Sequence, residues 1–215
     1  MPWRHRTAAT GAPREAEVTT RTGTLLSLNV ARAAPVTING RKVMTAIGKR
    51  AVEGERAVLP LGIEGDEQAD LSVHGGLSKA VYAYPSEHYA FWKTVRAQAQ
   101  VALWDEELPF GAIGENLSLQ GVAENELWIG DVLRFPGCQL AVSEPRLPCF
   151  KFNAAMGFKH AAKLMAESAW CGTYLAVRVP GTIAAGQTFS VVPGPREVGI
   201  SELFRARMSR AAAAS

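Results

Sequence analysis

Short runs in which apolar and polar residues alternate recur along most of the chain and predict many short β-strands. The alternation begins at Gly23 and gives a first strand over residues 24–31. Asn39-Gly40 is a strong turn signal, and residues 42–47 follow it as a return strand. Further strands are predicted where apolar residues stand between turn residues, at 58–61, 80–84, 117–119, 127–135 and 139–143, with 173–179 and 187–192 as a closing pair.

Two stretches with helical spacing interrupt the strands. The longer runs from Pro85 to about Trp104, and proline suits the first turn of a helix. Its apolar residues recur every three or four positions, at Tyr89, Trp92, Val95, Ala99 and Ala102. The second stretch covers residues 150–168 and breaks near Gly157. The pattern predicts an α+β protein that is mostly β, folded as a β-barrel or a strongly curved sheet with one long and several short helices.

Composition and charge indicate the kind of domain and exclude one class of function. The 215 residues are 47% hydrophobic and 20% charged, which suits one sizeable globular domain. Of the net charge of +3, residues 1–22 and 196–215 carry +2 each, whereas residues 23–195 hold 15 basic and 16 acidic residues. Because the basic excess lies in the two tails, the body does not present a nucleic-acid-binding surface.

The same features set the expected domain limits and location. Residues 1–22 are expected to form a disordered leader, residues 23–195 the folded domain, and residues 196–215 a short tail. No apolar run approaches the roughly 20 residues that span a bilayer, and the N-terminus lacks the apolar core of a secretory signal. The three cysteines form no C-x-x-C motif, which fits a reducing compartment. We therefore expect a cytoplasmic protein without membrane contacts.

Cys149 is the first candidate for chemistry. Pro145 and Pro148 restrict the backbone before it and would hold its sulfur on a stiff turn. Arg146 and Lys151 flank it, and a nearby cation stabilises a thiolate, the form that attacks substrates and binds metals. The alternative is an inert, half-buried cysteine in a loop.

Two glycine-bearing loops are further candidates. Paired glycines at Gly75 and Gly76 let a backbone approach a ligand and direct N–H groups at an anion, with His74 and Lys79 beside them. The alternative is a structural turn. In the second loop, Glu115-Asn116 follows Gly114 at the entrance to a strand, where turn capping is the alternative role.

Several familiar catalytic signatures are missing from the sequence. It contains no G-x-S-x-G, no G-x-G-x-x-G after a strand and no G-x-x-x-x-G-K-[ST], so hydrolase, dinucleotide and P-loop sites lack support. Its histidines show no metal-ligand spacing such as H-E-x-x-H. If a barrel brings the loops 74–79, 114–116 and 146–151 together, a thiolate would lie among cations and backbone donors. That chemistry suits a cofactor with both a transition metal and a phosphate.

Several motifs in order resemble the MOSC family, named for the C-terminal domain of molybdenum-cofactor sulfurases, and most closely its small stand-alone YiiM-like branch. They cover about residues 24–193 and are Thr45-Ala46-Ile47-Gly48-Lys49, Asp66 with Gln68-Ala69-Asp70-Leu71, His74-Gly75-Gly76, Lys79-Ala80-Val81-Tyr82, Glu87-His88-Tyr89 with Trp92, Gly114-Glu115-Asn116-Leu117, Ile129-Gly130-Asp131 and Pro145-Arg146-Leu147-Pro148-Cys149-Phe150-Lys151. As a set these motifs are specific, although each alone is not.

The resemblance implies a closed MOSC-type β-barrel and a molybdopterin-type cofactor whose molybdenum is bound by a protein cysteine, here Cys149. The remaining candidates for the cofactor's phosphate and pterin are Lys49, His74, Gly75, Gly76, Lys79, Asn116, Arg146 and Lys151. Related MOSC reductases act on N-hydroxylated compounds such as hydroxylaminopurines and amidoximes, and some descriptions of the family attach pyridoxal phosphate through fused sulfurases. No cysteine cluster suits an iron–sulfur centre, so a separate reductase would supply electrons.

Three points stay open at this stage. YiiM-like proteins end in a small three-helix domain, and residues 196–215 match a truncated remnant of it. Cys149 has two alternative roles: a sulfur carrier that holds sulfur on it as a persulfide, and a cysteine hydrolase that pairs it with His160. The oligomeric state is open, with a homodimer among the options.

Overall fold

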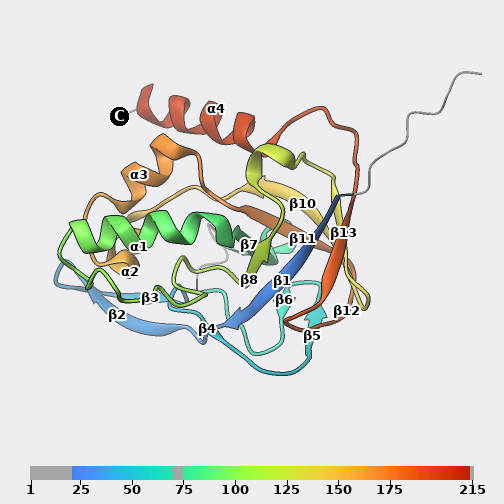
Figure 1. Cartoon of the computed structure of the whole chain (residues 1–215), viewed down its shortest axis with the longest axis horizontal. Coiled ribbons are helices and arrows are strands. Elements are labelled where there is room, and N and C mark those ends of the chain that lie inside the picture. Colours follow the sequence, from blue (N-terminus) through green and yellow to red (C-terminus); the bar gives the residue numbers. More distant parts are fainter. Residues whose placement is uncertain (1–20, 70–74, 214–215) are drawn as a thin grey trace, which may run out of the picture.

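The computed structural model describes residues 21–69 and 75–213, and within them seven strands close into a barrel (Figure 1). Around the barrel they run in the order β1 (Arg21–Val30), β8 (Leu117–Gln120), β7 (Val81–Pro85), β11 (Thr173–Val179), β10 (Gln139–Pro145), β9 (Val132–Arg134) and β13 (Thr188–Val192), and β13 pairs again with β1. β7 and β8 run parallel, while the other neighbouring barrel strands are antiparallel. The predicted closed barrel is confirmed.

Shorter strands extend the barrel on its outside. β4 (Arg50–Ala51) pairs with the end of β1, and β12 (Gly181–Ile183), β5 (Arg56–Leu59) and β6 (Gly62–Ile63) form a small sheet. β2 (Ala34–Ile38) and β3 (Arg41–Thr45) form a hairpin. Asn39 and Gly40 at its tip have φ values of 52° and 76°, the pattern of a two-residue hairpin turn, as the sequence predicts.

The predicted pairing of the last two barrel strands is wrong. β11 lies between β10 and β7, whereas β13 lies between β9 and β1. Neighbours in sequence need not be neighbours in a closed barrel, because closure takes the final strand back to the first. The strand that follows β11 in the sequence is instead β12, which pairs with β5.

The long helix is shorter than predicted. A 3-10 turn, η2 (Ser86–His88), leads into α1 (Tyr89–Gln98), which ends six residues before Trp104. Gln100 adopts a left-handed φ of 59°, its N–H bonds to the carbonyl of Ala97, and the N–H of Val101 bonds to that of Arg96. These two bonds form a Schellman cap, which stops the helix.

The other helices lie where the sequence predicts them or just beyond. α2 (Phe150–Met156) and α3 (Ala161–Ser168) are separated at Gly157, whose φ of 82° favours glycine. Figure 1 shows α1, α2 and α3 together on one side of the barrel, and the rings of Trp92 and Phe152 meet edge to face at 5.3 Å between α1 and α2. Two further 3-10 turns are η1 (Leu77–Lys79) and η3 (Glu124–Glu126).

Both ends of the folded domain extend past the expected limits. β1 begins at Arg21, so Arg21 and Thr22 belong to the barrel instead of the leader. The tail forms α4 (Ile200–Ala213), which buries Ile200 and Phe204. None of the helices described is both long and apolar enough to span a bilayer.

Candidate functional site

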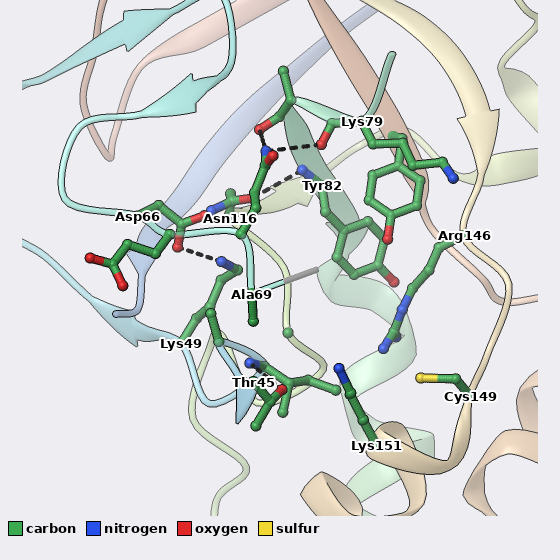
Figure 2. Close-up of a pocket in the computed structure, with 17 residues that line it drawn as sticks. Thr45, Lys49, Asp66, Ala69, Lys79, Tyr82, Asn116, Arg146, Cys149 and Lys151 are labelled. Atoms are coloured by element: carbon green, nitrogen blue, oxygen red, sulfur yellow. Dashed lines mark hydrogen bonds and ion pairs between the residues drawn. The ribbon is translucent and has the colours of Figure 1, made fainter. Parts of the chain in front are cut away.

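A single cleft gathers most of the predicted site residues. The space between its walls, with the solvent in its open mouth included, is about 640 Å³. One part of its wall comes from the end of β3, the segment after it and residues 66–69. The rest comes from η1, the start of β7, the turn before β8, β11 and the turn after β10. The lining residues used below are Lys49, Asp66, Gln68, Lys79, Tyr82, Gly114, Asn116, Arg146, Cys149, Lys151 and Tyr174 (Figure 2).

The predicted site residues divide into three groups. Those that line the cleft are Lys49, Lys79, Asn116, Arg146, Cys149 and Lys151. Gly75 and Gly76 are described but are not part of the lining. His74 lies outside the described residues, as do Asp70 and Leu71 of the family motif. The barrel therefore brings together the three loops named from sequence, although the binding role of each residue stays a prediction.

Cys149 is the accessible thiol of the three. Figure 2 shows its sulfur pointing into the cleft, toward the side chains of Lys151 and Arg146. Cys138 and Cys171 are buried elsewhere, and burial raises the pKa of Cys138 to about 11 and that of Cys171 above its ordinary value. Accessibility thus separates Cys149 from the two buried thiols.

Arg146 is a buried cation without an acidic partner among the described residues. Only 4% of its surface is exposed, and its Nη1 donates to the carbonyl of Ile113 at 3.1 Å. Its guanidinium carbon lies 5.1 Å from the centre of the Tyr82 ring and 4.8 Å from that of Phe152. Ring faces, one carbonyl and the Tyr82 hydroxyl carry no charge that would neutralise the guanidinium, so this position is suited to an anionic ligand.

Lys49 and Asp66 form a nearly buried ion pair on the opposite wall. Their side chains are 8% and 4% exposed, and Lys49 Nζ donates to Asp66 Oδ1, which also accepts the N–H of Ala31 at 2.8 Å. Burial lowers the pKa of Lys49, while Asp66 opposes that shift. Sequence reasoning assigned Asp66 no role, because a partner 17 residues away cannot be read from the motif.

Gln68 fixes the strand entrance that carries Lys79. Its amide nitrogen donates to Leu61 O at 2.8 Å and approaches the carbonyls of Lys79 and Ala80 at 3.3 Å. Its amide oxygen accepts the N–H of Gly76 at 3.2 Å. The Gln68 side chain thus connects the loop of Gly75 and Gly76 to the backbone just before β7. The sequence did not predict this contact.

Lys151 and Asn116 bond to backbone groups on the cleft wall. Lys151 Nζ donates to Met44 O at 3.2 Å, which joins the start of α2 to β3. The amide of Asn116 accepts from the N–H of Tyr82 and donates to the carbonyl of Asn29, both at 3.1 Å. Asn116 therefore connects β8 with β7 and β1.

Two glycines let the turn before β8 lie against the segment that holds Lys49. Gly111 and Gly114 have φ values of +88° and +93°. A Cβ on Gly111 would lie 2.6 Å from the carbonyl oxygen of Lys49, and one on Gly114 would lie 2.8 Å from Cγ1 of Ile47. No larger residue fits either place without displacing a cleft wall.

Glu115 lies behind this turn and is fully buried. Its Oε1 accepts from Tyr89 Oη, from the N–H of Gly111 at 2.7 Å and from Ser118 Oγ at 2.7 Å. Its Oε2 is buried and has no hydrogen-bond partner among the described residues. Burial outweighs these donors and raises the pKa of Glu115.

The raised pKa of Glu115 gives a test by pH. The folded state disfavours the ionised Glu115 carboxylate. Protonated Glu115 therefore contributes fully to stability below the ordinary carboxyl pKa of about 4.3, and this stability is lost as pH rises through the folded-state pKa. Glu115→Gln places an uncharged amide there. In urea unfolding from pH 4 upward, wild type is expected to lose stability relative to this variant. Parallel pH profiles of the two proteins would contradict the assignment.

The described lining of the cleft holds more basic than acidic side chains. Among its described lining residues are the cations Lys49, Lys79, Arg146 and Lys151 and two carboxylates, Asp66 and Glu67. Asp66 already pairs with Lys49, and the Glu67 carboxylate accepts the N–H of Ala33 at 2.7 Å. A low-dielectric cleft with this excess of positive charge attracts anions.

A model of the MOSC domain matches residues 70–190, more than half of the chain. The chain belongs to the MOSC domain family. Protein YiiM of Escherichia coli (strain K12) is 36% identical over 159 residues, which cover 74% of this chain and 68% of that protein. The crystal structure of YiiM from Geobacillus stearothermophilus superposes with a TM-score of 0.68 at 27% identity, covering 87% and 85% of the two chains. The YiiM-like assignment made from the sequence motifs is thus confirmed.

A third relative is named as a reductase. This protein of Gibberella moniliformis is 31% identical over 194 residues, which cover 88% of this chain but 33% of the relative. The match therefore aligns nearly the whole MOSC chain with one third of a longer protein.

Proposed function

We propose that the cleft binds a molybdopterin-type molybdenum cofactor and that the protein reduces N-hydroxylated compounds with electrons from a separate reductase. The observation that carries the proposal is Arg146, a buried cation without a carboxylate partner in the described chain, on the same short turn as Cys149, whose half-buried thiol lines the cleft. Membership of the MOSC family and the reductase-named relative support the same function.

The donor set of the cleft fits such a cofactor. A thiolate suits a transition metal of soft or high-valent character, and an arginine fork suits a phosphate. The described residues contain no group of three or more His, Cys, Asp or Glu side chains arranged for a metal ion, so metal at Cys149 would take its other donors from the cofactor. Arg146, Lys79 and Lys49 would hold its phosphate and pterin, and Lys151 would face the sulfur.

The protein's own residues would position and screen the reactants. When bound, the cofactor supplies the two-electron chemistry that converts N–OH, two protons and two electrons into N–H and water. Cys149 would fix the reacting centre on the stiff turn after Pro148. Tyr82 and Tyr174, whose ring centres lie 5.4 Å apart in the lining, would exclude water from the inner wall.

A second candidate function uses the same thiol without a metal. The Cys149 thiolate would attack the outer sulfur of a donor persulfide and release the donor thiol, and the new persulfide would pass that sulfur to an acceptor in the same way, with the cations Lys151 and Arg146 stabilising the anionic sulfur. The hydrolase reading has less support, because His160 is not among the described residues that line the cleft beside Cys149.

Expression with cofactor biosynthesis intact tests the proposal. Wild type is expected to retain molybdenum and pterin in equal amounts, and Cys149→Ala to lose the metal and the reduction of a hydroxylamino base. Cys138→Ala, which removes a buried thiol outside the cleft, is the matched control and should keep both. If wild type retains neither molybdenum nor pterin, the proposal fails. A mass increase of one sulfur atom on Cys149 in metal-free protein would establish the carrier instead.

A further inference from the structure

We propose that Glu115 is a positioning residue of the cleft: it holds the turn of residues 111–114 against the backbone of Lys49, and it does so as a neutral acid. Ionisation of Glu115 then weakens the binding of an anion in the cleft. This inference rests on the proposed function only insofar as the cleft is built for an anionic group. It gives a role in the site to a buried side chain that is not among the described residues of the lining.

Glu115 connects this turn with a helix and with a barrel strand. Its Oε1 accepts the N–H of Gly111 at 2.7 Å, and the same oxygen accepts from Tyr89 Oη on α1 and from Ser118 Oγ on β8. The N–H of Gly114 bonds to the carbonyl of Gly111 at 2.9 Å, which closes the turn. One carboxyl oxygen therefore fixes the turn to both α1 and β8.

The turn packs directly on the segment that carries Lys49. A Cβ on Gly111 would lie 2.6 Å from the carbonyl oxygen of Lys49, so the two backbones leave no room for a side chain between them. The ammonium group of Lys49 pairs with Asp66, and both residues line the cleft. A shift of the turn would therefore move the backbone that supports this cation of the cleft.

The surroundings of Glu115 favour its neutral form. The side chain is fully buried, and its Oε2 has no hydrogen-bond partner among the described residues, so a negative charge there is costly. The titratable groups that interact with it come from α1, β7 and the segment after β3, and they are Tyr89, Tyr82, Tyr84 and Lys49. Of these four, Lys49 is the one cation, and Asp66 already pairs with it. An ionised Glu115 would thus add negative charge beside the cleft and repel a bound anion.

The first measurement is the affinity of the full chain for inorganic pyrophosphate, by calorimetry over a series of pH values. E115Q keeps an acceptor for the three donors and cannot ionise, so as pH rises wild type should lose affinity relative to E115Q by about threefold to tenfold. E124Q is the matched control and should follow wild type. Glu124 is also a buried carboxylate, bonded to His88 and to the N–H of Gly172, but it is not among the described lining residues. A merely structural role of Glu115 would not produce this dependence on pH.

The second measurement is independent of ligand binding. In E115A three donors lose their acceptor, so backbone hydrogen exchange, followed by mass spectrometry, should speed up in residues 108–116 and also in the distant residues 45–50. E115Q should stay close to wild type, and Y89F, which removes one donor, gives the same comparison if E115A folds poorly. If exchange changes only in residues 108–116, or if wild type and E115Q bind pyrophosphate in parallel at every pH, the inference is overturned. If wild type binds no pyrophosphate at any pH but the two segments exchange together, the positioning role stands and the proposed cofactor site fails.

Discussion

Replacing Asp66 with alanine is expected to lower the free energy of unfolding by about 3–5 kcal/mol. The change leaves the ammonium group of Lys49 buried without its carboxylate and removes the acceptor of the Ala31 N–H. Neither group is in free contact with water, because the two side chains of the pair are 8% and 4% exposed. Urea unfolding at neutral pH measures the loss.

A neighbouring carboxylate supplies the control. Glu67 is exposed and accepts one backbone N–H, from Ala33, so Glu67→Ala is expected to cost about 1 kcal/mol or less. If Asp66→Ala lowers the free energy of unfolding by no more than Glu67→Ala does, Lys49 does not depend on Asp66 and its ammonium group reaches solvent instead.

A double variant separates the structural part of this pair from its part in binding. Apolar residues of similar size often replace a buried ion pair without loss of stability, so Lys49→Met with Asp66→Leu is expected to recover most of what Asp66→Ala loses. The cleft then lacks one of its cations, and affinity for a phosphate-bearing ligand should stay low. Recovery of both stability and affinity would show that Lys49 serves only the fold.

The sequence predicts local structure well where one residue type determines the backbone. Asn39-Gly40 specifies its hairpin turn, and Gly157 separates α2 from α3, because both positions need a positive φ that glycine and asparagine tolerate. The end of α1 was missed for the same physical reason. The left-handed residue of its Schellman cap is Gln100, not the usual glycine, so no sequence signal marks it.

The candidate site could likewise be predicted only where its residues are close in sequence. Arg146, Cys149 and Lys151 are close in sequence, and their shared wall could be predicted from the two prolines that stiffen the turn. The contacts that organise the cleft connect residues far apart, as in the pair of Lys49 with Asp66 and the bond of Lys151 to Met44 O, 107 residues away. They exist because barrel closure brings these segments together, and no local pattern encodes them.

The two kinds of cation in the cleft also differ in a way that the sequence hides. Lys49 and Arg146 are both buried, but Lys49 has a carboxylate partner, whereas Arg146 has ring faces, a carbonyl and the Tyr82 hydroxyl. A paired cation chiefly stabilises the wall it belongs to, whereas a buried cation without a counter-charge carries a cost that a bound anion would relieve. Arg146 is therefore the residue on which affinity should depend most.

Arg146→Met is expected to weaken binding of inorganic pyrophosphate by roughly thirtyfold to several-thousandfold, since removing one partner of a buried charge pair costs about 2–5 kcal/mol. Stability should change little, within about 1 kcal/mol, because methionine fills much of the volume between Tyr82 and Phe152 without a buried charge. Calorimetric titration and urea unfolding of the same preparations measure the two effects.

Two further substitutions make this result specific. Arg146→Lys keeps the charge but loses the planar fork, so its affinity should fall between those of wild type and Arg146→Met, and it remains informative if the methionine variant folds poorly. Lys151→Met removes a cation that is only half-buried and already bonded to Met44 O, so its effect should be smaller, about tenfold or less. If Arg146→Met binds pyrophosphate as tightly as wild type, the anion site lies elsewhere. The proposed cofactor function would then lose its main support.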